Sequence, residues 1–159
     1  MLTFKILLLL FLANGSPVVA KRILGTRLAL PLDCGNKFVD GRPLFGASKT
    51  IRGIVSSILA TSAGAMLTGI PMIVGMQFAL ASMCGDLASS FIKRRLGLPP
   101  SSRALGLDQL PESILPMLVC WHALNLDLAT ALAAVAIFFA GELLLSRILF
   151  RLKIRERPY

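Results

Sequence analysis

The fold is decided by residues 54–92, which read IVSSILATSAGAMLTGIPMIVGMQFALASMCGDLASSFI. Two apolar blocks flank Pro71, and each has roughly the 20 residues with which a helix crosses a bilayer. Small residues such as Ser57, Thr61 and Ala65 recur at every fourth position. This spacing lets helix backbones approach closely in lipid. The stretch therefore predicts a pair of adjacent transmembrane helices joined by a tight turn.

Apolar blocks of similar character lie on both sides of this pair. Apolar residues make up 55% of the chain and charged residues 16%, which is too apolar for an ordinary soluble domain. A soluble bundle is disfavoured because its helices need a polar face, and these blocks are apolar nearly all round. The sequence predicts an all-α membrane protein, with a single integral membrane domain over residues 1–159. Its five expected transmembrane helices are 2–20, 54–70, 72–92, 111–125 and 126–149.

The first of these blocks has a second interpretation, as a secretory signal peptide. Lys5 would form its charged start, Ile6–Ala13 its apolar centre and Val18–Ala20 its cleavage site. A cleaved signal would place the following loop outside, yet that loop is rich in cations. We therefore favour a first transmembrane helix, which Gly15 and Pro17 loosen near its inner end.

The distribution of cations predicts the orientation. All but one of the 17 Lys and Arg residues lie in 21–53, in 93–110 or from Arg147 onward. The turns near Gly69–Pro71 and Asn125–Asp127 hold none. Because cytoplasmic loops carry the excess of Lys and Arg, we expect an inner-membrane protein with its N-terminus outside, its C-terminus inside and both basic loops cytoplasmic. The Gly, Phe and Leu content of the first loop favours an ordered loop.

The net charge of +9 has two interpretations. In a soluble protein it suggests binding to nucleic acid. In a membrane protein it reports orientation and contact with anionic headgroups, so we expect no nucleic-acid partner. The three cysteines lack the spacing of metal ligands, and their odd number favours free thiols.

Two acids stand out because of where they lie. Asp86 is inside the block 72–92, about two turns from its cytoplasmic end, where a charge is costly unless it is paired or bound. Asp108 lies in the next loop, close to the membrane surface. Two carboxylates from separate elements could hold a divalent cation through their oxygens. Alternatively, Asp86 could form an ion pair with Lys93 or Arg94 that only fixes packing, and Asp108 could favour a helix start.

The acids have cationic neighbours in the predicted topology, namely Lys49, Arg52, Lys93 and Arg94. Several cations beside a metal suit a polyphosphate, because many negative oxygens need to be neutralised at once. Membrane orientation explains cations at cytoplasmic helix ends equally well. Both interpretations stay open at the level of single residues.

Two runs of residues resemble a known family. The runs are DGRPLFGASKTIRG at 40–53 and GDLASSFIKRRLGL at 85–98, and Leu107–Gln109 follow in the next loop. They resemble the first cytoplasmic loop, the third helix end and the following loop of CDP-archaeol synthases and their bacterial relatives. The related CDP-diacylglycerol synthases share a Lys-Thr-x-x-Gly element, here Lys49–Gly53, and a Gly-Asp…Ser…Lys-Arg element, here within 85–94.

The resemblance implies five transmembrane helices and a Mg2+-dependent nucleotidyltransferase. Such an enzyme takes CTP and a lipid phosphate in the membrane and makes a CDP-lipid and pyrophosphate. Asp86 and Asp108 would bind the metal, and Lys93 would complete the catalytic set. The residues implied around CTP are Lys49, Thr50, Arg52, Gly53 and Arg94.

The chain departs from the pattern at two places. The Gly-rich segment and the paired acids that end the signature of the larger enzymes are absent from it. After Asp108 and Gln109 the family has a further acid, two residues on, whereas this chain continues Leu110-Pro111-Glu112. Either Glu112 takes that place or the metal site has one acid fewer. The residues also leave open whether the lipid tails are isoprenoid ethers or acyl esters. A non-enzymatic alternative is a small transport or scaffold subunit whose basic loops bind anionic lipid.

Overall fold

The computed structural model describes residues 1–99, 102 and 104–151, with side chains described up to residue 145. Within this part the chain is all-α, as predicted, and strand pairing is limited to isolated bridges at Pro31–Thr50 and Lys37–Pro43. The helices are α1 (Leu2–Leu24), α2 (Ile51–Leu67), α3 (Met72–Arg95), α4 (Gln109–Val119) and α5 (Leu128–Arg151). Arg103 and the basic tail after Arg151, both used to predict orientation, lie outside the described residues.

Three of these helices are long and apolar enough to cross a membrane, namely α1, α3 and α5 over its described residues 128–145. The two others are shorter. α2 has 17 residues, and α4 has 11 and ends at Val119, short of the predicted end at residue 125. α4 continues through Pro116 and ends three residues later at Val119, where the N–H of Cys120 bonds to the carbonyl of Pro116. Residues 120–127 form the turn to α5.

Three helix ends at the basic end of the bundle lie farther out than predicted. α1 runs through Pro17 to Leu24 instead of ending at residue 20. α3 continues through its basic residues to Arg95. α2 begins at Ile51, because the side chain of Thr50 caps it by accepting the N–H of Gly53 at 3.2 Å. Hydropathy marks where a helix leaves the apolar core, whereas backbone hydrogen bonding continues into the polar region.

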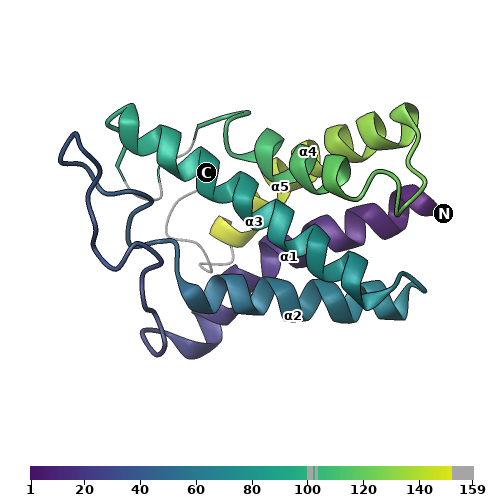
Figure 1. Cartoon of the computed structure of the whole chain (residues 1–159), viewed down its shortest axis with the longest axis horizontal. Coiled ribbons are helices and arrows are strands. Elements are labelled where there is room, and N and C mark those ends of the chain that lie inside the picture. Colours follow the sequence, from purple (N-terminus) through teal and green to yellow (C-terminus); the bar gives the residue numbers. More distant parts are fainter. Residues whose placement is uncertain (100–101, 103, 152–159) are drawn as a thin grey trace.

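Successive helices run back and forth along one axis (Figure 1), so the N-terminus lies at one end and both basic loops lie at the other. α2 packs against α1 and α3, and α5 packs against α1 and α4. The largest fully buried side chains are Phe78, Phe138, Ile6, Leu9 and Leu10. The core therefore draws its largest side chains from α1, α3 and α5.

Small residues bring α2 and α3 together, as their spacing predicted. A Cβ added to Gly75 would lie 2.6 Å from the Cβ of Ala65 and 3.0 Å from the Cα of Ser62. Such distances leave no room for a side chain, so the two helices pack nearly backbone to backbone. This contact holds the start of α3 against the end of α2.

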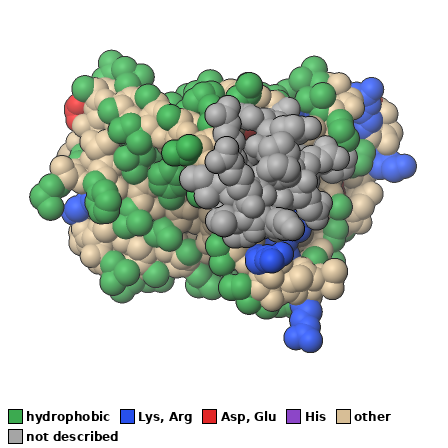
Figure 2. All heavy atoms as spheres, turned by 180° about the vertical axis from the view of Figure 1, so that it is seen from behind, with side chains coloured by type: hydrophobic (Ala, Val, Ile, Leu, Met, Phe, Trp, Pro, Cys, Tyr) green, Lys and Arg blue, Asp and Glu red, His purple; other side chains and the backbone are tan. Residues whose placement is uncertain are grey.

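The surface has the pattern expected of a protein embedded in lipid. Apolar side chains cover the body of the molecule, and most of the visible cations lie at the loop end (Figure 2). Leu59, Leu132 and Leu144 are each more than 60% exposed, which suits contact with lipid tails.

Candidate active site

An ion pair joins the first loop to the third helix. Lys49 Nζ lies 2.6 Å from Asp86 Oδ1 and 2.5 Å from Asp86 Oδ2, so the lysine contacts both carboxylate oxygens. The two side chains are 22% and 25% exposed. Lys49 is placed by the turn that immediately precedes the Thr50 cap of α2. The predicted alternative partners of Asp86, Lys93 and Arg94, bind elsewhere.

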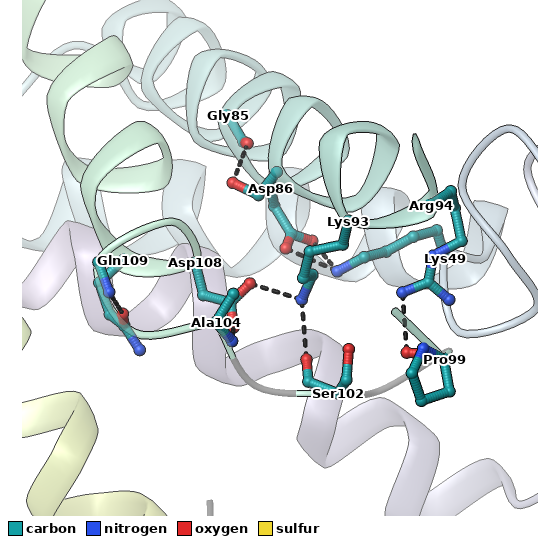
Figure 3. A network of polar contacts seen from close by, with 12 residues as sticks. Lys49, Gly85, Asp86, Lys93, Arg94, Pro99, Ser102, Ala104, Asp108 and Gln109 are labelled. Carbon is teal, nitrogen blue, oxygen red and sulfur yellow. Dashed lines mark hydrogen bonds and ion pairs between the residues drawn. The ribbon is translucent and has the colours of Figure 1, made fainter. Parts of the chain in front are cut away.

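A second ion pair lies beside the first (Figure 3). Lys93 Nζ lies 2.5 Å from Asp108 Oδ1 and donates to the carbonyl of Ser102 at 3.0 Å. The other oxygen of Asp108 accepts the N–H of Ala104 at 2.9 Å. Asp108 directly precedes α4 but makes no capping bond to it. Its carboxylate therefore faces Lys93 on α3, on the side where Asp86 also lies.

Arg94 is buried with spare hydrogen-bond donors. Its Nη2 donates to the carbonyl of Pro99 at 2.9 Å. Its Nε and Nη1 atoms have no hydrogen-bond partner within the described part of the chain, although the residue is only 4% exposed. A buried guanidinium with unpaired donors is unfavourable until an acceptor reaches it. Arg94 is therefore suited to an anionic ligand.

The structure directs Arg52 away from these acids. Its Nη1 donates to the carbonyls of Gly25 at 3.0 Å and Arg27 at 2.5 Å, at the end of α1. Thr50 and Gly53 form the capped first turn of α2. These three residues, expected around CTP, thus shape the segment that carries Lys49.

Glu112 is a further acid near the site, and the sequence left its role open. It lies in the first turn of α4 and is 6% exposed. Its carboxyl group interacts electrostatically with Asp86, Asp108, Lys49 and Glu142. A buried acid in an apolar block is itself a signal of function in a membrane protein.

Gly85 is what allows Glu112 to lie so close to Asp86. A Cβ on Gly85 would lie 2.3 Å from the carbonyl oxygen of Pro111 and 2.7 Å from the Cα of Glu112. The hydroxyl of Ser82 donates to the carbonyl of Glu112 at 2.9 Å. The start of α4 is therefore held directly against α3, beside the acid.

The donor set fits one kind of metal site. No three His, Cys, Asp or Glu residues gather at ligand spacing anywhere among the described residues. Mg2+ is commonly held by one or two carboxylates together with phosphate oxygens and water. Asp86 and Asp108 are the carboxylates that could hold Mg2+ in this way, and Lys49, Lys93 and Arg94 are the cations beside them.

A reciprocal contact holds the first loop against the end of α3. Arg95 Nη1 donates to Asp40 Oδ1 at 2.8 Å, and its guanidinium lies 4.9 Å from the ring centres of Phe38 and Phe91. Arg42 Nη1 donates in return to the carbonyl of Arg95 at 2.5 Å. These contacts hold the first loop against the end of α3, where it borders the two ion pairs.

Comparisons with known proteins agree on one family. The chain matches the family described as CarS-like, CDP-archaeol synthase, over residues 1–72 and 64–159. It is 37% identical to the CDP-archaeol synthase of Sulfurisphaera tokodaii over 92% of this chain and 89% of that protein. It is 32% identical to the CDP-archaeol synthase of Pyrobaculum calidifontis over 94% of this chain and 92% of that protein. It is 42% identical to the CDP-archaeol synthase of Saccharolobus islandicus over 69% of this chain and 66% of that protein.

A solved structure has a similar fold. It is described as an intramembrane enzyme for archaeal membrane lipids biosynthesis. The TM-score is 0.66 at 29% sequence identity, and the match covers 86% of this chain and 89% of the other.

Proposed function

Because the chain belongs to the CDP-archaeol synthase family, we propose that it is a membrane CTP:lipid-phosphate cytidylyltransferase. An oxygen of the lipid phosphate forms a bond to the α-phosphorus of CTP. The bond between that phosphorus and the bridging oxygen breaks, and pyrophosphate leaves with the electron pair. The relatives' name favours an isoprenoid-ether lipid phosphate as acceptor.

The adjacent ion pairs of Lys49 with Asp86 and of Lys93 with Asp108 are the observation that carries this proposal. A lipid phosphate is already ionised at neutral pH, so the reaction needs no strong general base. What it needs is positioning and neutralisation of negative charge. Mg2+ held by Asp86 and Asp108 would supply positive charge to the phosphate oxygens.

The basic residues have distinct roles in this proposal. Lys49 and Arg94 donate to phosphate oxygens of CTP, since Arg94 has unpaired buried donors and Lys49 lies on the first-loop side of the acids. Lys93 holds the carboxylate of Asp108 toward α3. Thr50, Gly53 and Arg52 act through the backbone that presents Lys49.

The membrane topology is part of the same proposal. α2 and α4, with the turns that follow them, complete five crossings alongside the three longer helices. The N-terminus is outside, and the loop end with both ion pairs faces the cytoplasm, where CTP is available. The lipid tails lie along the apolar surface of the helices, so the acceptor phosphate is held at the level of the site.

The test is a transfer assay with purified protein in detergent. CTP and a lipid phosphate should yield CDP-lipid and pyrophosphate in equal amounts. A chelator should stop the reaction, and added Mg2+ should restore it. Isoprenoid-ether and acyl-ester phosphates of matched tail length, assayed side by side, decide the acceptor class.

Binding separates this function from the non-enzymatic alternative. If wild-type protein shows no Mg2+-dependent binding of CTP, the enzyme assignment falls and a scaffold that binds anionic lipid is favoured.

A further inference from the structure

The first loop contains a buried carboxylate with three backbone donors. Asp33 is 6% exposed. Its Oδ1 accepts the N–H of Gly35 at 3.1 Å, and its Oδ2 accepts the N–H groups of Phe45 at 3.2 Å and Gly46 at 2.9 Å. Charge-assisted bonds of this kind are about twice as strong as neutral ones. Asp33 therefore ties two parts of the loop that are more than ten residues apart.

These bonds lead directly to Lys49. The carbonyl of Gly46 accepts the N–H of Lys49 at 3.1 Å, and the carbonyl of Lys49 accepts the N–H of Leu32 at 2.8 Å. Lys49 is thus held on both sides by segments that Asp33 joins. Its Nζ then reaches the carboxylate of Asp86.

The charge of Asp33 suits this task. Burial alone raises the pKa of Asp33, but the N–H groups of Gly46, Gly35 and Phe45 together outweigh burial and hold the pKa below its ordinary value. Asp33 accordingly remains ionised at neutral pH. It faces backbone donors and forms no ion pair among the described residues, so its charge serves the loop itself.

We propose that Asp33 is a positioning residue for CTP: it fixes the 45–49 turn and so holds Lys49 in place for the phosphates beside Asp86. The proposal rests on the function proposed above. It assigns Asp33 no contact with the substrate.

The proposal predicts a specific kinetic signature for Asp33→Asn. An amide has one acceptor oxygen, so its NH2 group must face either Gly35 or the Phe45–Gly46 pair. The 45–49 turn then also adopts conformations that do not place Lys49 beside Asp86. When the competent state is only a fraction of the population, the apparent affinity falls by that fraction, so we expect KM and Kd for CTP to rise about tenfold. Bound CTP re-forms the site, so kcat should stay within about twofold.

The matched control is Asp127→Asn. Asp127 also accepts a backbone N–H, that of Thr130 at 3.0 Å, but it lies in the turn between α4 and α5 at the opposite end of the molecule. The Asp127→Asn substitution should leave KM, Kd and kcat for CTP unchanged. Thermal unfolding of each variant in detergent shows whether both remain folded.

A double variant tests whether Asp33 acts through Lys49. In a Lys49→Met background, Asp33→Asn should change the Kd of CTP by less than about twofold, because coupled residues are not additive. If the two residues contributed independently, Asp33→Asn would raise the Kd of CTP by the same factor with or without Lys49.

Limited trypsin digestion gives a readout that needs no activity. Cleavage after Lys49 requires the turn to open, so Asp33→Asn should speed it by about tenfold. Cleavage after the exposed Arg27 should not change.

The outcomes separate the two proposals. If wild-type protein transfers CMP but Asp33→Asn has wild-type KM, or loses kcat with KM unchanged, Asp33 has no positioning role and the enzyme assignment stands. If wild-type protein does not bind CTP, both proposals fail as statements about CTP. Trypsin then still decides whether Asp33 holds Lys49.

Discussion

Lys49 Nζ lies 2.6 Å from Asp86 Oδ1, across 37 positions of sequence. The pair connects the end of the first loop to the third helix, and Lys93 with Asp108 connects that helix to the next loop. The candidate site therefore exists only when both polar stretches and α3 are assembled together. The consequences of this arrangement can be tested one residue at a time.

Asp86→Asn should lower CMP transfer by roughly 100-fold or more, since it removes a charge that the reaction needs to hold its cations. The near-isosteric amide keeps the packing of α3, so the unfolding temperature should change little. Asp127→Asn is the control, because Asp127 is exposed and lies in the turn between α4 and α5, at the opposite end of the molecule from the acids. Wild-type activity in Asp86→Asn would show that the acid site is misassigned.

Lys49→Met and Arg52→Met should differ, although the sequence groups the two residues. A charge-assisted hydrogen bond contributes about 1.5–3 kcal/mol, so Lys49→Met should weaken CTP binding by about 10–100-fold. Arg52 donates to the carbonyls of Gly25 and Arg27, so Arg52→Met should lower stability and change CTP affinity by less than about threefold. Isothermal titration measures both affinities. Equal losses would restore Arg52 as a phosphate ligand.

Gly85→Ala should separate α3 from the start of α4. The new Cβ would meet the backbone of Pro111 at 2.3 Å, and backbone cannot rotate aside. We expect a loss of about 1–3 kcal/mol in stability, with reduced activity as Asp108 moves relative to Asp86. Gly15→Ala is the control, because no atom lies within 4 Å of its added Cβ. In α1 it should be neutral or stabilising. Thermal unfolding compares them, and equal losses would contradict this contact.

The pH dependence of the first loop should follow Asp33. Its pKa in the folded protein lies below the ordinary 3.8, so the charge stabilises the loop above 3.8 and the effect is lost as pH falls through the lowered value. Hydrogen-exchange protection at Phe45 and Gly46, corrected for intrinsic rates, should therefore persist from pH 7 to about 4 and disappear only below that. Loss of protection near pH 5–6 would mean that the pKa is raised instead. Asp33→Asn should show no such transition.

Cys34 provides a test of membrane orientation. It is a free, exposed cysteine in the first loop, whereas Cys120 is buried and Cys84 lies within α3. A membrane-impermeant maleimide should label Cys34 in inside-out vesicles and not in right-side-out vesicles. Cys34→Ser controls for labelling elsewhere. Labelling from the outside would reverse the proposed topology.

Much of this architecture follows from local patterns. Apolar blocks predicted helices at the right places, and the small-residue spacing predicted a close approach of helices, which is seen at Gly75 and Ala65. The acids of interest, Asp86 and Asp108, were recognisable because charges near apolar blocks are costly. Helix ends were less predictable, since hydropathy does not report where hydrogen bonding stops. The predicted ends were residues 20 and 125, whereas α1 continues to Leu24 and α4 ends at Val119.

The residues alone predicted a helical chain embedded in lipid and singled out Asp86 and Asp108 as candidate acids, because burial cost and periodicity act on each segment locally. The partners of these side chains could be known only from the packed helices. Asp86 meets Lys49 rather than Lys93, Arg52 binds the end of α1, and Asp33 holds the turn before α2. Pairing depends on distances between segments that are remote in sequence, and those distances are set when the helices pack.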